Sequence, residues 1–210
     1  MRSALKSLAF GVTAAFVAGS ALASGTLTYN STTGTPIPDL TTVTNTIVVP
    51  ATDWTGSDTI RDVNVYINLS HTWDSDLTLK VTGPDGTEVP LWAGVGGSSD
   101  GFDVTIDDEA AMNINAIVGT FRTQRYPTDR LCEFDGKDPG GAYTLTISDT
   151  VGGDSGFLNR WSVTIEGAEG RFTNDCEADR VRRGRGLGSH ANNGGGNGED
   201  LNPPGQRPPH

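Results

Sequence analysis

Residues 71–91 read HTWDSDLTLKVTGPDGTEVPL and predict a β-hairpin. Leu77, Leu79 and Val81 alternate with polar residues, so one side of an extended strand is apolar and the other is polar. Gly-Pro-Asp-Gly at residues 83–86 then reverses the chain, because proline presets the backbone of a turn and the residues after it tolerate tight conformations. The apolar alternation resumes after this turn, as the second strand of a hairpin requires.

The same alternation predicts strands elsewhere in the chain, and no stretch beyond the N-terminal segment has a sustained apolar repeat of 3.6 residues. The other predicted strands are Thr46–Val49, Ile60–Leu69, Phe102–Ile106, Ala142–Ser148 and Leu158–Glu166. Residues 107–140 are predicted to be rich in loops. The fold class is therefore all-β, a single-domain β-sandwich or jelly roll of about 140 residues, which is enough to bury a core of its own.

The two ends of the chain differ from this domain in composition. Residues 1–23 combine a basic start, a short apolar run and an Ala-Leu-Ala ending, and they predict a secretory signal peptide. The mature protein is then secreted, extracellular or periplasmic, without a membrane span. Residues 24–35 are predicted to be a flexible lead-in, and residues 167–210, rich in Gly, Asn and Pro, a disordered tail.

Three blocks within residues 36–166 resemble one protein family. They are residues 71–91, the acidic stretch GGSSDGFDVTIDDEA at 96–110, and GGAYTLTISDTVGGDSGFLNRWSVTI at 140–165. In this order they are similar to the P domain, or homo B domain, that follows the catalytic domain of kexin- and furin-like subtilisin-family proteases. The middle block looks like the bacterial branch of the family.

This resemblance implies a non-catalytic module, since the P domain of convertases packs against the protease and stabilises it. The expected partner is an extracellular protein or a protease. Two alternatives stay open: a serine-type endopeptidase activity, as family membership suggests, and a carbohydrate-binding sandwich, for which Trp73 and Trp92 are the hints.

The GDSG sequence at residues 153–156 resembles the surroundings of protease nucleophiles, but Ser155 is not predicted to be catalytic. A nucleophilic serine needs an imidazole base within reach. The three histidines are His71, His190 and His210, and two of them fall in the predicted tail. His71 is expected to be structural, with its ring bonded to the backbone or to a carboxylate, and the GDSG sequence is expected to form the turn between the last two strands.

Acidity is concentrated in the predicted domain. Residues 24–166 hold 7 Lys and Arg against 20 Asp and Glu, a net charge of −13, which disfavours nucleic acid as a partner and favours cations. Calcium takes six to eight oxygen ligands from carboxylates and carbonyls, and the resemblance implies it too. The candidate ligands are Asp76, Asp100, Asp103, Asp107 and Asp108. The alternative is that these carboxylates are merely solvated, because no D-x-D-x-D-G spacing is present.

The chain contains two cysteines, Cys132 and Cys176. An oxidising compartment allows them to form a disulfide, which would link the start of the tail to the domain. A reactive or metal-binding thiol pair is less well supported, since the spacing is not C-x-x-C and no histidine is near in sequence. We therefore predict a disulfide.

Overall fold

The predicted hairpin is present in the computed structural model, which describes residues 25–123 and 130–170. Strands β5 (Leu77–Thr82) and β6 (Glu88–Ala93) pair antiparallel. At the turn, the Gly86 N–H donates to the Gly83 carbonyl at 3.0 Å, and the Gly83 N–H donates to the Thr87 carbonyl at 2.9 Å. The alternation of side chains on β5 buries Leu77, Leu79 and Val81, as the sequence predicts.

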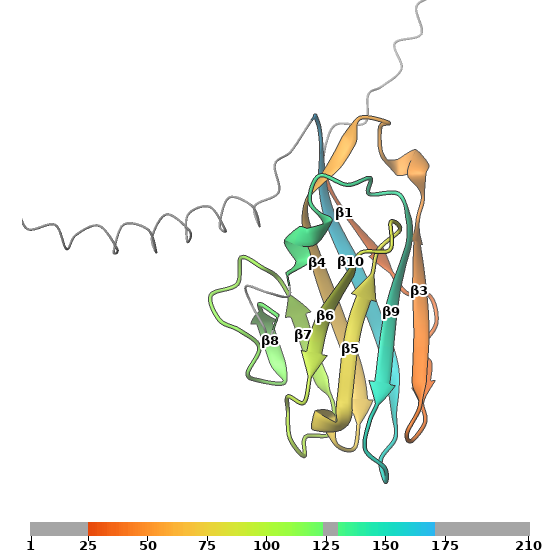
Figure 1. The fold of residues 1–210 in the computed structure, drawn as a ribbon, viewed down its shortest axis with the longest axis vertical. Coiled ribbons are helices and arrows are strands. Elements are labelled where there is room, and N and C mark those ends of the chain that lie inside the picture. The colour runs from red at the N-terminus through yellow and green to blue at the C-terminus, as the bar shows by residue number, and fades with distance from the viewer. Residues whose placement is uncertain (1–24, 124–129, 171–210) are drawn as a thin grey trace, which may run out of the picture.

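The strands form two sheets that enclose one hydrophobic core, and the predicted all-β sandwich is confirmed (Figure 1). The order in the first sheet is β1-β10-β4-β7-β8, with β2 also paired to β10, and the order in the second is β3-β9-β5-β6. The remaining strands are β1 (Gly25–Asn30), β2 (Thr35–Ile37), β3 (Thr42–Val49), β4 (Asp58–His71), β7 (Phe102–Ile106), β8 (Val118–Phe121), β9 (Gly141–Asp149) and β10 (Gly156–Glu169). Short 3₁₀ turns are η1 (Ala51–Asp53), η2 (Asp74–Asp76) and η3 (Leu131–Phe134).

Strands β4 and β10 are the longest, with 14 residues each, and they lie side by side in the first sheet. Val63, Val65 and Ile67 on β4 are each at most 1% exposed. The residues between them are only partly buried, because successive side chains of a strand point to opposite faces. The outer face of this strand pair therefore presents polar side chains.

The flexible lead-in predicted for residues 24–35 is wrong over most of its length. Gly25–Asn30 form β1, which pairs antiparallel with β10 from Gly25 opposite Gly167 to Asn30 opposite Ser162. The edge of β10 has backbone groups that need partners, and threonine-rich segments suit an extended strand. The hydrogen bonds that stabilise β1 are made with β10, which is distant in sequence. The local composition of residues 24–35 therefore did not indicate a strand.

The described residues of the span 107–140 are mostly loop, as predicted, but they also include β8 and η3. Strand β8 runs parallel to β7, an arrangement that a hairpin-based interpretation of the sequence does not anticipate. The predicted signal peptide and nearly all of the predicted tail lie outside the described residues. Within the described part of the chain, no helix is long and apolar enough to cross a membrane.

Candidate functional site

The GDSG sequence forms the turn between β9 and β10, as predicted. The Thr72 hydroxyl donates to Asp154 Oδ1 at 2.7 Å, which fixes the turn against the end of β4. Gly156 pairs with His71, and a Cβ atom added to this glycine would lie 2.2 Å from the Ser70 carbonyl oxygen. The final glycine is thus required by close backbone approach, a structural reason that is independent of catalysis.

His71 is 2% exposed, and both of its ring nitrogens face neighbours. Nδ1 lies 2.9 Å from the Trp73 carbonyl oxygen and 3.2 Å from the Trp73 nitrogen, while Nε2 lies 3.4 Å from Asp149 Oδ2. A base for Ser155 would need one ring nitrogen directed at the hydroxyl. His71 is the only histidine in the described part of the chain, so these residues contain no serine–histidine pair of the protease kind. The structural role predicted for His71 is confirmed.

The two tryptophans that hint at a carbohydrate site are in different environments. Trp92 is 2% exposed and stacks on Phe102 with ring centroids 3.8 Å apart, so it belongs to the core. Trp73 is 44% exposed. A sugar platform built on both rings is therefore excluded, and Trp73 alone keeps an accessible face.

The predicted calcium ligands near the start of the acidic region are placed at one end of the sandwich. Asp76 belongs to η2 and is 7% exposed, with the charges of Asp149 and Asp154 near it. Asp100 is exposed in the loop before β7. These two residues are on neighbouring segments, because the Ser75 N–H donates to the Gly97 carbonyl of that loop at 3.1 Å.

The other three predicted ligands point to separate neighbours. Asp103 Oδ2 accepts the Asn68 amide at 2.9 Å. Asp107 Oδ1 accepts the Glu109 N–H at 2.7 Å. Asp108 is buried and accepts the Cys132 N–H at 2.8 Å. The five residues do not converge on one point, and within residues 25–123 and 130–170 no three His, Cys, Asp or Glu side chains are grouped as a metal site would need.

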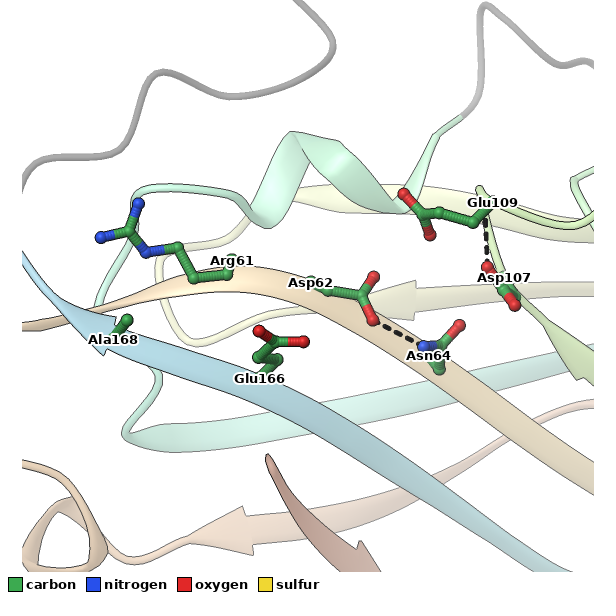
Figure 2. A pocket seen from close by; sticks show the side chains of 7 residues that line it. All are labelled: Arg61, Asp62, Asn64, Asp107, Glu109, Glu166 and Ala168. Atoms are coloured by element: carbon green, nitrogen blue, oxygen red, sulfur yellow. Dashed lines mark hydrogen bonds between the residues drawn. The ribbon is translucent and has the colours of Figure 1, made fainter. Parts of the chain in front are cut away.

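An open hollow of about 550 Å³ on the outer face of β4 and β10 brings four acidic residues together (Figure 2). We refer to it as the acidic hollow. It is lined by Arg61, Asp62, Asn64, Asp107, Glu109, Glu166 and Ala168. The lining comes from two adjacent strands and from the segment that follows β7, so the hollow depends on the pairing of β4 with both β10 and β7.

Asp62 and Glu166 are directly paired positions of β4 and β10. Like charges placed opposite each other in this way are destabilising. The pKa of Asp62 is raised to about 6, mainly by burial and then by the charges of Asp107 and Glu166, while the Val63 N–H offsets part of the increase. The Asn64 amide donates to Asp62 Oδ2 at 2.7 Å and holds that carboxylate in place.

Glu109 approaches Asp62 and Asp107 from the loop after β7 (Figure 2). The pKa of Glu109 is raised to about 7, first by burial and then by its hydrogen bond with Asp107 and the charges of Asp62 and Asp107. A positive group placed beside such a carboxylate stabilises its ionised form, which burial and neighbouring negative charges disfavour. The acidic hollow therefore favours a cation.

The described lining of the acidic hollow suits the binding of a positively charged group. None of these described residues is a serine, cysteine or histidine. The described lining holds four carboxylates and one arginine, an excess of negative charge. A basic side chain of another protein would neutralise that excess and form charge-assisted hydrogen bonds.

Sequence reasoning identified Asp107, in the acidic stretch that also holds Glu109, but missed Asp62 and Glu166 as members of a site. Asp62 and Glu166 are 104 positions apart, and only the strand register makes them neighbours. The available signal was the polar side of two alternating strands, which is also what a solvated sheet face shows. The pairing could not be inferred from that signal.

A family model described as the proprotein convertase P-domain matches residues 60–165, which is half of the chain. Leupeptin-inactivating enzyme 1 of Streptomyces exfoliatus is 26% identical over 145 residues, 63% of this chain. The chain spans only 28% of the length of that enzyme.

Two solved structures of an Aeromonas sobria serine protease are also similar. The protease alone has a TM-score of 0.41 at 19% identity, covering 67% of this chain and 26% of the protease chain. Its complex with the chaperone ORF2 has a TM-score of 0.42 at 16% identity, covering 69% of this chain and 27% of that chain.

Proposed function

Because the chain belongs to the proprotein convertase P-domain family, we propose that it is a secreted, non-catalytic module that binds a protease or a protease-associated protein. The acidic hollow is its contact surface in this proposal, and a basic side chain of the partner occupies it. The observation that supports this proposal most directly is that Asp62 and Glu166 face each other on paired strands. Two like charges in these positions destabilise the folded protein. A cationic group of the partner, bound between them, would remove that cost.

The alternative of a serine-type endopeptidase is disfavoured by His71, whose two ring nitrogens face the Trp73 backbone and Asp149. We expect the purified mature protein to show no labelling by a fluorophosphonate probe and no hydrolysis of peptide substrates, with a subtilisin as positive control. Labelling of Ser155 that disappears in Ser155→Ala would overturn the non-catalytic assignment.

The acidic hollow can be tested with a defined cation, a fluorescent hexa-arginine peptide. At pH 8 and low salt, we expect Asp62→Asn with Glu109→Gln to weaken binding roughly tenfold, because two charges near the peptide contribute about 1 kcal/mol or less each in a solvated hollow. Fluorescence anisotropy measures the affinity. The matched control is Glu88→Gln with Asp138→Asn, which removes the same charge outside the hollow and should change affinity less than about twofold.

The pH dependence adds a second readout to the same experiment. The pKa of Asp62 is raised to about 6 and that of Glu109 to about 7, so both lose their charge between pH 8 and pH 5. Carboxylates near the ordinary pKa of about 4 stay ionised at pH 5. Peptide binding by the wild-type protein should therefore fall at pH 5 toward that of the hollow variant. Equal weakening by both double variants would show general attraction to an acidic protein and would exclude the hollow as the binding site.

A further inference from the structure

A cluster of arginines follows the domain in the sequence. Residues 180–185 read RVRRGR, with four arginines and no acidic residue, and we refer to them as the basic segment. The basic segment lies outside the described residues. The acidic hollow has the opposite charge, because its described lining holds four carboxylates and one arginine. One chain therefore carries both an acidic surface and a short segment of complementary charge.

Strand β10 delivers the C-terminal part of the chain to the acidic hollow. Glu166 and Ala168 of this strand line the hollow, and the strand ends at Glu169. Arg61 of the lining is bonded to the same end, because its Nη2 group donates to the Glu169 carbonyl at 3.0 Å. The basic segment begins 11 positions after Glu169, a reach of up to about 36 Å for an extended chain. It is therefore long enough to return to the hollow without a change in the domain.

The predicted disulfide between Cys132 and Cys176 would shorten this tether. The Cys132 N–H donates to Asp108 Oδ2 at 2.8 Å, and Asp108 stands between Asp107 and Glu109, which both line the hollow. A bridge at Cys132 would thus hold Cys176 close to the hollow, and the first arginine follows within about 14 Å of chain. A short flexible tether of this kind gives an effective concentration of about 1 mM.

One hydrogen-bond acceptor in the hollow lacks a donor. Asn64 Oδ1 is buried and has no partner among the described residues, while the Asn64 amide donates to Asp62 Oδ2 at 2.7 Å (Figure 2). A buried acceptor left unpaired is costly. Arginine has five N–H donors in a planar fork, so one guanidinium can serve a carboxylate and a neighbouring amide oxygen together. This need for a donor is independent of the charge of the hollow, and a guanidinium meets both.

We propose that the basic segment, residues 180–185, binds in the acidic hollow of its own chain. Its guanidinium groups pair there with Asp62, Glu109 and Glu166, and a basic group of a partner has to displace them. The protein then contains a competitor for its own partner surface. This regulatory consequence rests on the proposed function, whereas the contact between the basic segment and the hollow does not.

Limited proteolysis of the full mature chain with trypsin at pH 8 tests the contact, because trypsin cleaves after arginine and a bound arginine is protected. Mass spectrometry gives the initial rate of cleavage within residues 180–185 relative to cleavage after Arg171, which precedes the basic segment. Exposed ion pairs are weak, so the Kd of the segment for the hollow is roughly 0.3–1 mM. At an effective concentration of about 1 mM, relative cleavage should be about two- to fourfold slower in the wild-type protein than in Asp62→Asn with Glu109→Gln.

Two further variants separate this contact from general electrostatics. Glu88→Gln with Asp138→Asn removes the same charge outside the described lining and should keep the wild-type protection. Arg182→Gln with Arg183→Gln changes no residue of the described domain, so the domain keeps its fold. Cleavage after the two remaining arginines of the basic segment should then accelerate toward the rate in the hollow variant. Sodium chloride at about 0.5 M should also remove the protection, because it screens exposed charges.

Equal relative cleavage in the wild-type protein and both acidic double variants would exclude the contact. Protection that grows with protein concentration would also overturn the proposal, because it would identify the tail of a second copy as the occupant. Protection that is lost only in the hollow variant supports the contact even if the hexa-arginine peptide does not bind, a result that counts against the proposed function alone. Peptide binding without any protection has the opposite meaning: the proposed function stands and the intramolecular contact is excluded.

Discussion

Trp161→Ala should lower the free energy of unfolding by about 3–5 kcal/mol, the cost of removing a large aromatic side chain from a packed core. Trp161 lies on β10 and is 0% exposed. Its indole N–H donates to Asn45 Oδ1 on β3 at 2.7 Å, so this one side chain connects the two sheets. Truncation leaves a cavity and also an acceptor without its donor. Urea unfolding followed by circular dichroism measures the loss.

Two further variants separate the causes of this loss. Trp161→Phe keeps most of the apolar volume but leaves Asn45 Oδ1 unpaired, so it should cost about 1–3 kcal/mol. Phe157→Ala, on the same strand but at a residue that is 42% exposed, should cost less than about 1 kcal/mol. If Trp161→Ala and Phe157→Ala are equally mild, the core described above does not hold the sheets together.

Asn45 also explains why the N-terminal segment is ordered, contrary to the prediction from sequence. Its Nδ2 group donates to the Thr33 carbonyl at 3.0 Å and to Thr35 Oγ1 at 2.9 Å, while its Oδ1 accepts from Trp161. One amide therefore links Thr33 and the start of β2 to Trp161 of the first sheet. Composition alone indicated flexibility, because the segment is polar and lacks apolar periodicity. Its hydrogen bonds to Asn45 are made with a residue outside the segment, so they leave no sign in the local sequence.

The parts of the fold that were predictable are those determined by local pattern. The turn at residues 83–86 and the alternation along β4 depend on neighbours in sequence, and the predicted span Phe102–Ile106 agrees with β7 residue for residue. Strand β8 was missed because its support is β7, to which it runs parallel, and its residues Val118–Phe121 are mostly exposed. A short exposed strand has little apolar pattern to detect.

The candidate sites, like the strands, could be predicted only where local sequence determines them. The prediction that Ser155 is not catalytic needed only the number and position of histidines. It selected acids by their density along the chain, which favoured residues 100–109. The structure instead distinguishes Asp62, by its register opposite Glu166 and by the burial that raises its pKa. Register and burial are properties of the folded chain, so acidic density could not reveal them.

The predicted disulfide between Cys132 and Cys176 should be a major contribution to stability. Cys132 is a buried residue of η3, and Cys176 lies outside the described residues, so the pairing stays a prediction. A bridge between them would close a loop of about 45 residues, which in the chain-entropy model stabilises the folded state by up to about 4 kcal/mol. We expect Cys176→Ala to lower the free energy of unfolding by about 2–4 kcal/mol.

Cys176→Ala is the informative variant because it leaves the buried Cys132 in place, together with the hydrogen bond from its backbone N–H to Asp108 Oδ2. A lower stability can then be attributed to the lost crosslink rather than to a cavity in the core. Wild-type protein reduced with dithiothreitol should match the variant, since both lack the same covalent constraint. Intact-mass analysis after alkylation of unreduced, denatured protein decides the pairing itself: unchanged mass supports the bridge, whereas addition of two alkyl groups means that both thiols are free and that the tail is not joined to the domain at Cys132.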